Sequence, residues 1–141
     1  MLDTSTLILL GRISDVSQLP DEAEITAVTL AELSVGPLVA TTDEERSARQ
    51  SHLQLAESDF DALPFDSHAA RAFGRVAASL RRAGRKPAAR SYDAMIAATA
   101  IANELAVYTC NPDDFSQIDD LEVVAVAHPD HAEPKQPSAN E

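Results

Sequence analysis

Acidic side chains occur at several points of the chain where they could take part in chemistry. Asp3 is the third residue, within the apolar and β-branched run MLDTSTLILL. Glu32 follows a second such run, Asp93 lies in YDAMIAATAIANEL, and Asp113 and Asp114 follow AVYTCNP. Asp3 is the hardest to explain by structure alone, because aspartate has low strand propensity and burying an unpaired charge is costly.

Carboxylates that meet in one place favour a metal site. Several of them within a few ångströms repel one another, and some would stay protonated at neutral pH. A bound divalent cation removes that penalty. Mg²⁺ takes oxygen ligands, keeps several waters, and is usually held by one or two carboxylates together with substrate phosphate. Such a site suits metal-assisted hydrolysis of a phosphodiester, in which the metal lowers the pKa of a water and stabilises charge on the leaving oxygen.

Each acid taken singly also has a structural explanation. Thr29-x-x-Glu32 fits a capping box, in which the glutamate returns a hydrogen bond to the cap. Asp93 near a helix start gains from the helix dipole. Asp113 and Asp114 can be ordinary turn residues. The elements that position the acids must therefore decide whether they form a site.

Apolar and β-branched runs alternate with helical patterns along the chain. We predict strands at about residues 1–3, 25–28, 62–65, 106–110 and 121–126. We predict helices from near Thr29 past Glu32, from a cap at Thr42 or Asp43, from a cap at Asp66 or Ser67 to a stop at Gly84, and over 92–105 with Ser91 as N-cap. Residues 85–90 and 111–119 are expected to be loops.

Strands that alternate with helices predict an α/β fold, with a parallel sheet and helices on both faces. In such sheets ligands bind outside the carboxyl ends of the strands. Connectivity alone places Asp3, Glu32 and the Asp113–Asp114 pair at that edge. Asp93 joins them if its helix starts there.

Composition fits one globular domain. The chain has 141 residues, of which 45% are hydrophobic, and we expect a domain over 1–127 and a polar, disordered tail over 128–141. No apolar run is long enough to span a membrane, and the start does not resemble a secretion signal. The single cysteine, Cys110, excludes an internal disulfide and fits a reducing cytoplasm. Four glycines in all exclude a glycine-rich phosphate loop.

The charge is distributed unevenly. The net charge is −12, yet residues 71–90 hold seven bases and no acid. A globally acidic chain repels nucleic acid at long range, whereas a basic island can bind phosphate locally. A solvated helix face explains the island equally well, so both interpretations stay open.

Four motifs together resemble a known family. LDTSTLI, AVTLAEL, YDAMIAATAIANEL and YTCNPDDF occur in the order and spacing of PIN-domain nucleases. Over about residues 1–126 the chain looks most like the VapC-type toxins of bacterial toxin–antitoxin pairs. The resemblance implies a PIN-like three-layer fold with a central parallel sheet of four to five strands flanked by helices. It also implies an Mg²⁺- or Mn²⁺-dependent endoribonuclease, a cognate antitoxin, and a homodimer or toxin–antitoxin hetero-oligomer.

The resemblance also implies roles for individual residues. Asp3 and Asp93 match the metal-binding aspartates, Glu32 matches the acidic residue after the second strand, and Ser5 matches a small polar residue near the site. Many relatives have Thr-x-Asp after the fourth strand, where this chain has Thr109-Cys110-Asn111. Asp114 is the expected replacement, with Asp113 and Asn111 as other fourth-position ligands. We expect one metal to be held firmly and a second only when RNA is bound.

The basic island supplies the expected RNA contacts, from Arg82, Arg85, Lys86 and Arg90. The loop from Arg85 to Arg90 leads into the Asp93 helix, so these bases can hold phosphates beside the scissile bond.

Other functions remain open on the sequence. One is a non-catalytic interaction module that keeps the fold. Another is a phosphotransfer enzyme with Asp3 as nucleophile, although such sites commonly need a second aspartate where Ser5 stands. Cys110 is expected to be a buried, inert thiol, and a metal site at His128-Pro-Asp-His131 is disfavoured because that stretch lies in the expected tail.

Overall fold

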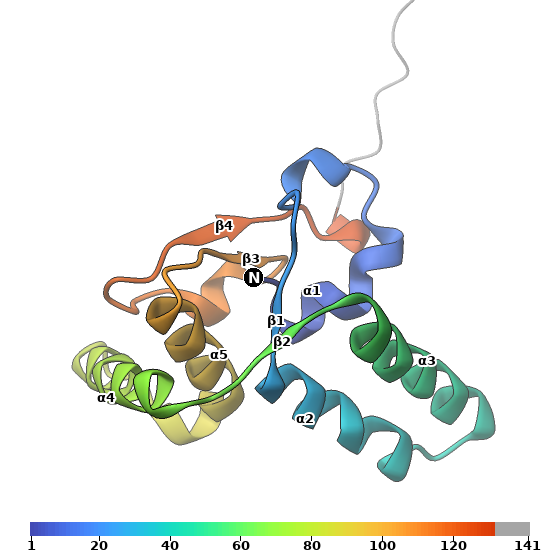
Figure 1. Cartoon of the computed structure of the whole chain (residues 1–141), viewed down its shortest axis with the longest axis horizontal. Coiled ribbons are helices and arrows are strands. Elements are labelled where there is room, and N and C mark those ends of the chain that lie inside the picture. The colour runs from blue at the N-terminus through green and yellow to red at the C-terminus, as the bar shows by residue number, and fades with distance from the viewer. Residues whose placement is uncertain (132–141) are drawn as a thin grey trace, which may run out of the picture.

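The computed structural model describes residues 1–131 as five α-helices and four short β-strands with 3₁₀ turns between them (Figure 1). The helices are α1 (Thr4–Leu9), α2 (Ala27–Val35), α3 (Asp43–Asp59), α4 (Ser67–Arg82) and α5 (Ser91–Ala102). The strands are β1 (Ile25–Thr26), β2 (Ala62–Leu63), β3 (Val107–Thr109) and β4 (Val123–Ala125). The 3₁₀ helices that matter for the site are η4 (Pro87–Arg90) and η5 (Pro112–Phe115).

All strand pairing in the described residues is parallel. β1 pairs with β2, and β3 pairs with β4. Leu2 joins the two pairs, because it forms a parallel bridge with Tyr108 and its backbone N–H donates to the Glu24 carbonyl at 2.9 Å. The predicted parallel α/β arrangement is therefore present, while a single sheet of four to five strands is not seen within residues 1–131.

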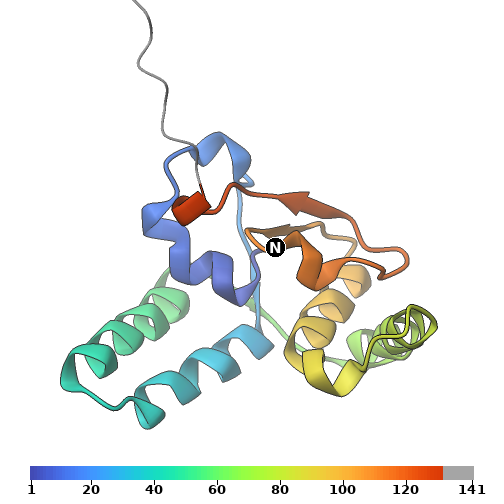
Figure 2. The same cartoon turned by 180° about the vertical axis from the view of Figure 1, so that it is seen from behind.

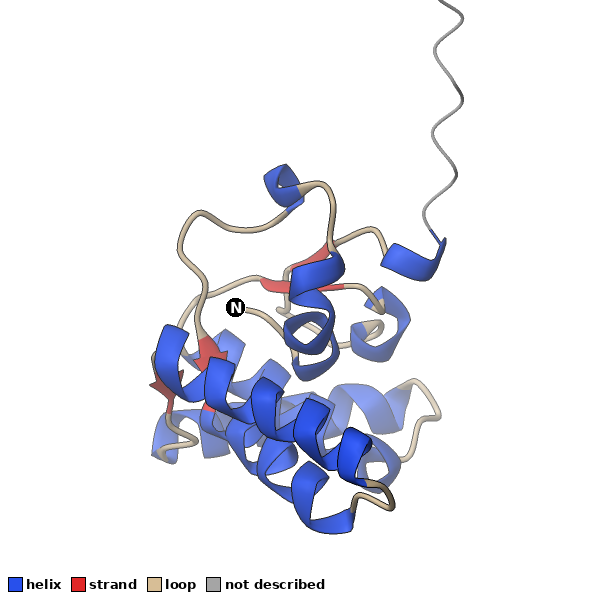
Figure 3. Ribbon diagram, turned by 90° about the vertical axis from the view of Figure 1, so that its right-hand side faces the viewer, coloured by secondary structure: helices blue, strands red, loops and turns tan. Residues whose placement is uncertain are grey.

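The first two predicted strands are short because a helix cap follows or ends each of them. The predicted strand at 1–3 is reduced to the bridge at Leu2, since Asp3 is already the N-cap of α1. The strand predicted at 25–28 ends at Thr26, whose side chain accepts from the Thr29 backbone N–H at 3.1 Å and caps α2. Figure 3 shows these short strands lying among the helices.

Two predicted caps were wrong. Thr29 does not begin a capping box, because α2 starts earlier at Ala27 and Glu32 lies beyond its first turn. Ser91 is the first residue of α5, and its N-cap is Arg90, without a side-chain cap. The other predicted caps were confirmed at Thr42 and Asp66, and Gly84 follows the end of α4 with a φ of 76°, a conformation that suits glycine.

The helices form pairs on either side of the strands. α4 packs against α5, and α2 packs against α3, as Figures 1 and 2 show. The α5 sequence is rich in alanine, and Ala94, Ala97 and Ala98 are almost fully buried. Together with Ile96 they share a core with Val76 and Leu80 of α4. This packing fixes the start of α5, where Asp93 lies.

The region after β4 was predicted to be a disordered tail. Residues 129–131 form a 3₁₀ turn, and Asp130 pairs with the guanidinium of Arg12. The rest of that predicted tail, 132–141, lies outside the described residues. None of the helices within residues 1–131 has the length and apolar character that a membrane span requires.

Candidate active site

Asp3 is a buried carboxylate held by three hydrogen-bond donors. Its side chain is 2% exposed. Oδ2 accepts from the Ser5 hydroxyl at 3.0 Å and from the Thr109 hydroxyl at 2.9 Å, and Oδ1 accepts from the Thr6 backbone N–H at 3.2 Å. An ionised carboxylate has about four lone-pair sites, so one direction on Oδ1 is left for a further ligand.

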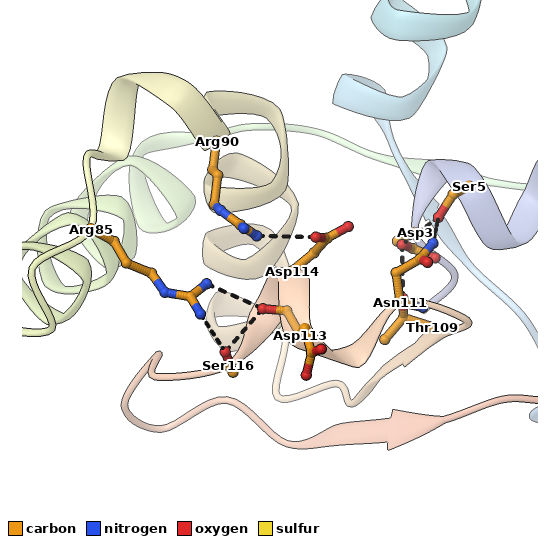
Figure 4. Close-up of polar contacts among 9 residues, drawn as sticks. All are labelled: Asp3, Ser5, Arg85, Arg90, Thr109, Asn111, Asp113, Asp114 and Ser116. Atoms are coloured by element: carbon orange, nitrogen blue, oxygen red, sulfur yellow. Dashed lines mark hydrogen bonds and ion pairs between the residues drawn. The ribbon is translucent and has the colours of Figure 1, made fainter.

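Asn111 extends this arrangement. Its side-chain amide donates to the Ser5 hydroxyl at 3.0 Å, and its backbone N–H donates to the Thr109 hydroxyl at 2.9 Å. Figure 4 shows Asn111 beside Asp3, Ser5 and Thr109. We call these four residues the Asp3 network. The predicted supporting residues Ser5 and Thr109 thus contact Asp3 directly, and Asn111 meets it through both of them.

Glu32 reaches the same region from α2. The Thr4 hydroxyl donates to its Oε1 at 2.8 Å and lies 3.0 Å from the Thr29 hydroxyl. Burial raises the pKa of the Glu32 carboxyl; the Thr4 hydrogen bond acts against this, and the Asp3 charge adds to it. Glu32 therefore does not cap its own helix as predicted, but holds the start of α1 through Thr4.

Asp93 stands in the first turn of α5 and has no hydrogen bond or ion pair to any residue within 1–131. Burial raises its pKa to about 6, and the charges of Asp114, Glu32 and Asp3 add to the effect, while Arg90 lowers the pKa. These charge effects place Asp3, Glu32 and Asp114 within electrostatic range of Asp93. Strand ends predicted the grouping of Asp3, Glu32 and Asp114, and Asp93 was expected to join them only if its helix started at the same edge.

A cleft of about 460 Å³ opens where Asp93 and Glu32 face each other. We call it the Asp93 cleft. Its lining consists of Glu32, Ala88, Arg90, Ser91, Tyr92 and Asp93. One wall comes from α2 and the other from η4 and the start of α5, so the cleft lies between segments distant in sequence.

Asp114 and Asp113 differ sharply although they are neighbours in η5. The Asp114 carboxylate accepts from Arg90 Nη1 at 3.1 Å, and in Figure 4 it lies between Arg90 and the Asp3 network. The Asp113 side chain is exposed and points away from Asp114. The Asp113 backbone carbonyl accepts hydrogen bonds from Arg85 Nη1 at 3.2 Å and from the Ser116 hydroxyl at 2.9 Å. This geometry favours Asp114 as the fourth acid.

The bases of the island at residues 71–90 make different contacts. Arg85 binds the loop of Asp113 and also donates to the Ser116 hydroxyl at 3.0 Å. Arg82 pairs with Asp119 at 2.6 Å on the surface. Arg90 lies inside the Asp93 cleft, whereas Lys86 has no hydrogen bond or ion pair within the described chain. Of the four predicted RNA contacts, Arg90 is therefore the one that lines the acidic cleft.

Three structural roles at the site were not predicted from the sequence. The Thr4 hydroxyl donates to Glu32, Arg85 donates to the η5 loop, and Tyr92 lines the Asp93 cleft. The run DTST and the position of Tyr92 directly before Asp93 were the available signals. Cys110 was predicted to be inert, and it is 8% exposed with a thiol whose pKa is raised by burial.

The donor set fits a hard divalent cation. Carboxylate and amide oxygens are the ligands that Mg²⁺ takes, and it keeps waters in the remaining positions. Within residues 1–131, no three acidic, histidine or cysteine side chains lie close enough to hold a metal directly as they stand. Asp3 and Asp93, with waters and a substrate phosphate, would give the smaller carboxylate set with which Mg²⁺ is usually bound.

The fold and site define a family. The PIN domain family model matches residues 1–121, and the chain belongs to the PIN domain family. It is 40% identical over 121 residues to "Ribonuclease VapC5" of Mycobacterium tuberculosis, covering 84% of this chain and 87% of that protein. It is 30% identical to "Ribonuclease VapC" of Rickettsia bellii, covering 89% and 95% of the two chains.

Solved structures agree with this assignment. A crystal structure of VapBC-5, a member of the VapBC family of toxin–antitoxin systems from Mycobacterium tuberculosis, matches with a TM-score of 0.75 and 38% identity, covering 89% of this chain and 96% of that chain. FitAcB from Neisseria gonorrhoeae matches with a TM-score of 0.66 and 26% identity, covering 93% and 98%. The predicted PIN-like fold and the resemblance to VapC proteins are thereby confirmed.

Proposed function

We propose that this chain is a VapC-type toxin, a cytoplasmic endoribonuclease that uses Mg²⁺ or Mn²⁺ to hydrolyse RNA phosphodiester bonds. The observation that carries the proposal is the gathering of Asp3, Glu32, Asp93 and Asp114, in which burial, and then the charges of the other three acids, raise the pKa of Asp93 to about 6. A grouping that costs folding energy without a cation is expected at a functional site. Membership of the PIN domain family and the names of the ribonuclease relatives support the same activity.

Asp3 and Asp93 would hold the metal, with Asp114 and Asn111 completing its surroundings. The bound metal would supply an activated water and stabilise the charge that forms on the leaving oxygen. Ser5 and Thr109 orient the Asp3 carboxylate through hydrogen bonds of 3.0 and 2.9 Å. This orientation matters because the outer partners of metal ligands fix ligand geometry and basicity.

Glu32 is suited to move the proton of the attacking water. Its pKa is raised by burial, and its Oε1 is held by the Thr4 hydroxyl. A carboxylate with a raised pKa takes a proton more readily near neutral pH. Arg90, inside the same cleft, supplies positive charge for the non-bridging oxygens of the phosphate.

A partner protein is part of the proposal. The chain is similar to VapBC-5 of Mycobacterium tuberculosis, a member of the VapBC family of toxin–antitoxin systems. We expect a small antitoxin that inserts an arginine among the carboxylates, since the planar guanidinium pairs two carboxylate oxygens at once. Expression of this chain alone should slow growth, and co-expression with its cognate antitoxin should restore it; a harmless, well-expressed chain would contradict the toxin role.

The activity itself is tested with Asp93→Asn. The substitution keeps the shape of the side chain and removes the charge that faces the metal, so cleavage of bulk RNA in Mg²⁺ should fall at least about 100-fold while the melting curve still shows a folded protein. Chelator should stop the wild-type enzyme. Asp43→Asn is the matched control, because Asp43 also lies in the first turn of a helix but outside the site. Full activity in folded Asp93→Asn would overturn the proposal.

The structure disfavours the phosphotransfer alternative. Such sites commonly need a second aspartate two residues after the nucleophile, where this chain has Ser5, whose hydroxyl donates to Asp3 Oδ2 at 3.0 Å. Absence of turnover in every metal tested would instead favour the interaction module.

A further inference from the structure

One aromatic side chain differs from all the others in this protein. The chain has four phenylalanines, two tyrosines and no tryptophan. Phe115 is 1% exposed, and Phe60, Phe73 and Tyr108 pack against the hydrophobic clusters. Phe65 meets Phe73 edge-to-face, with ring centroids 6.3 Å apart.

Tyr92 has no such partner. It is 49% exposed, belongs to none of the hydrophobic clusters, and has no ring contact or hydrogen bond of its side chain within residues 1–131. An exposed tyrosine is ordinary at a random surface position. Here, however, it lines the Asp93 cleft and directly precedes Asp93 in α5.

The cleft thus contains three kinds of group side by side. Glu32 and Asp93 are the acids, Arg90 is a cation, and Tyr92 offers an aromatic face. Grooves that bind single-stranded nucleic acid combine positive charge along the backbone with aromatic side chains on which bases stack. Tyr92 and Asp93 line the same cleft, so a base held at Tyr92 would belong to a nucleotide near a phosphate bound by the metal at Asp93.

We propose that Tyr92 is a stacking platform for an unpaired base beside the scissile phosphate. The inference rests on the proposed ribonuclease function and deepens it. A base inside a duplex is already stacked on its neighbours and does not offer its face to the protein. Stacking on tyrosine tolerates any base, so Tyr92 selects for strandedness and not for sequence.

A protein partner is the competing occupant for an exposed tyrosine. RNA is favoured because the ring shares its cleft with Arg90 and with the acids proposed to act on a phosphodiester. The apolar side chains that are more exposed than Tyr92, namely Leu38 at 86%, Val16 at 72% and Val39 at 60%, lie on η2 (Val16–Gln18) and η3 (Gly36–Val39) and not in this cleft.

The experiment compares Tyr92→Ala, Tyr92→Phe and the control Leu38→Ala. Binding of a short single-stranded oligoribonucleotide is measured in chelator, where no cleavage is expected, and kcat/KM is measured in Mg²⁺. Tyr92→Ala should lower affinity and kcat/KM roughly tenfold, within the range found for base–aromatic stacking. Tyr92→Phe keeps the ring and should behave like wild type, as should Leu38→Ala.

Two further measurements isolate the stacked base. An oligonucleotide that lacks one base next to the cleavage site should bind wild type and Tyr92→Ala equally. Because the chain has two tyrosines and no tryptophan, its ultraviolet emission comes from Tyr92 and the packed Tyr108. RNA should quench this emission in the wild type, after correction for RNA absorption, and quench it far less in Tyr92→Phe.

The outcomes separate this inference from the function it rests on. If the wild type cleaves RNA but Tyr92→Ala matches it in affinity and kcat/KM and no quenching occurs, the stacking role is overturned and Tyr92 is left as a protein-contact surface. If Tyr92→Ala prefers single-stranded over duplex RNA as strongly as the wild type does, the role of Tyr92 in that preference is overturned. If the wild type neither binds nor cleaves RNA, the proposed function fails and this inference fails with it.

Discussion

The two halves of the acidic site are built in opposite ways. In the Asp3 network, the carboxylate is buried and accepts hydrogen bonds from Ser5, Thr109 and the Thr6 backbone. In the Asp93 cleft, Asp93 has no such donors within residues 1–131, and its pKa is raised to about 6. The first half is stabilised by the protein itself, whereas in the second half burial and the neighbouring acids oppose the ionised form of Asp93, a cost that the proposed cation would remove.

This difference shows what fixes the position of the carboxylate in each half of the site. A carboxylate that accepts several hydrogen bonds is fixed in position before any ligand binds. A carboxylate among like charges gains only when a cation compensates them. We expect substitutions in the Asp3 network to cost stability and activity together, and substitutions around the Asp93 cleft to cost activity or metal affinity alone.

Asp114 and Asp113 give the largest expected contrast. Asp114 faces the site and accepts from Arg90, whereas the Asp113 side chain is exposed. Asp114→Ala should lower the cleavage rate about 10- to 100-fold at saturating Mg²⁺, and Asp113→Ala should stay within about twofold of wild type, as an exposed charge does. Equal, unaffected rates in both variants would mean that Asn111 or water completes the metal site.

Thr109→Val tests the Asp3 network. The valine keeps the shape but removes the donor to Asp3 and the acceptor for the Asn111 backbone N–H. Urea unfolding should show a loss of about 1–3 kcal/mol, and RNA cleavage should fall about tenfold. Thr41→Val is the matched control, because the Thr41 hydroxyl bonds Glu45 on the surface. Unchanged stability in Thr109→Val would show that the network does not order the site.

Arg85 and Lys86 separate loop support from RNA binding. Arg85→Ala removes the contacts to the Asp113 carbonyl and the Ser116 hydroxyl, so cleavage at low Mg²⁺ should fall about 3- to 10-fold and recover as Mg²⁺ rises. Lys86→Ala should leave the Mg²⁺ response unchanged and flatten the dependence of log affinity on log salt by about 0.7. If Arg85→Ala left the Mg²⁺ response unchanged and flattened the salt dependence, as expected for Lys86→Ala, Arg85 would not support the loop.

The smallest effect concerns stability without metal. In the folded protein Asp93 keeps its proton up to about pH 6, whereas its ordinary pKa is 3.8. Between these pH values the folded state therefore binds more protons than the unfolded state. The free energy of unfolding consequently falls as the pH rises through this range. In chelator, Asp93→Asn should therefore be more stable than wild type by about 1 kcal/mol near pH 7.5, after allowing for solvent screening, and should match it near pH 3.5.

Urea unfolding of the two proteins across this pH range makes the measurement. Added Mn²⁺ should stabilise the wild type and leave Asp93→Asn nearly unchanged. If the difference in the free energy of unfolding between the two proteins were the same at all pH values, the pKa of Asp93 would not be raised in the folded protein.

Local sequence determined the features that depend on neighbouring residues. Thr42 and Asp66 were correctly predicted as caps, and Gly84 as a stop, because their side chains or backbone act within a single turn of helix. The alternation of strands and helices predicted the parallel arrangement, since connectivity constrains the direction of strands. The order of the acidic motifs predicted which carboxylates would gather.

Only the tertiary structure decided how those carboxylates are held. Thr109 bonds Asp3 across 106 positions of the chain, and no local pattern specifies such a contact. Thr29 and Ser91 were wrongly predicted as caps because competing residues, Thr26 and Arg90, begin the helices earlier. The contrast between a bonded Asp3 and an unbonded Asp93 likewise follows from which donors packing brings near, because both residues carry the same carboxylate.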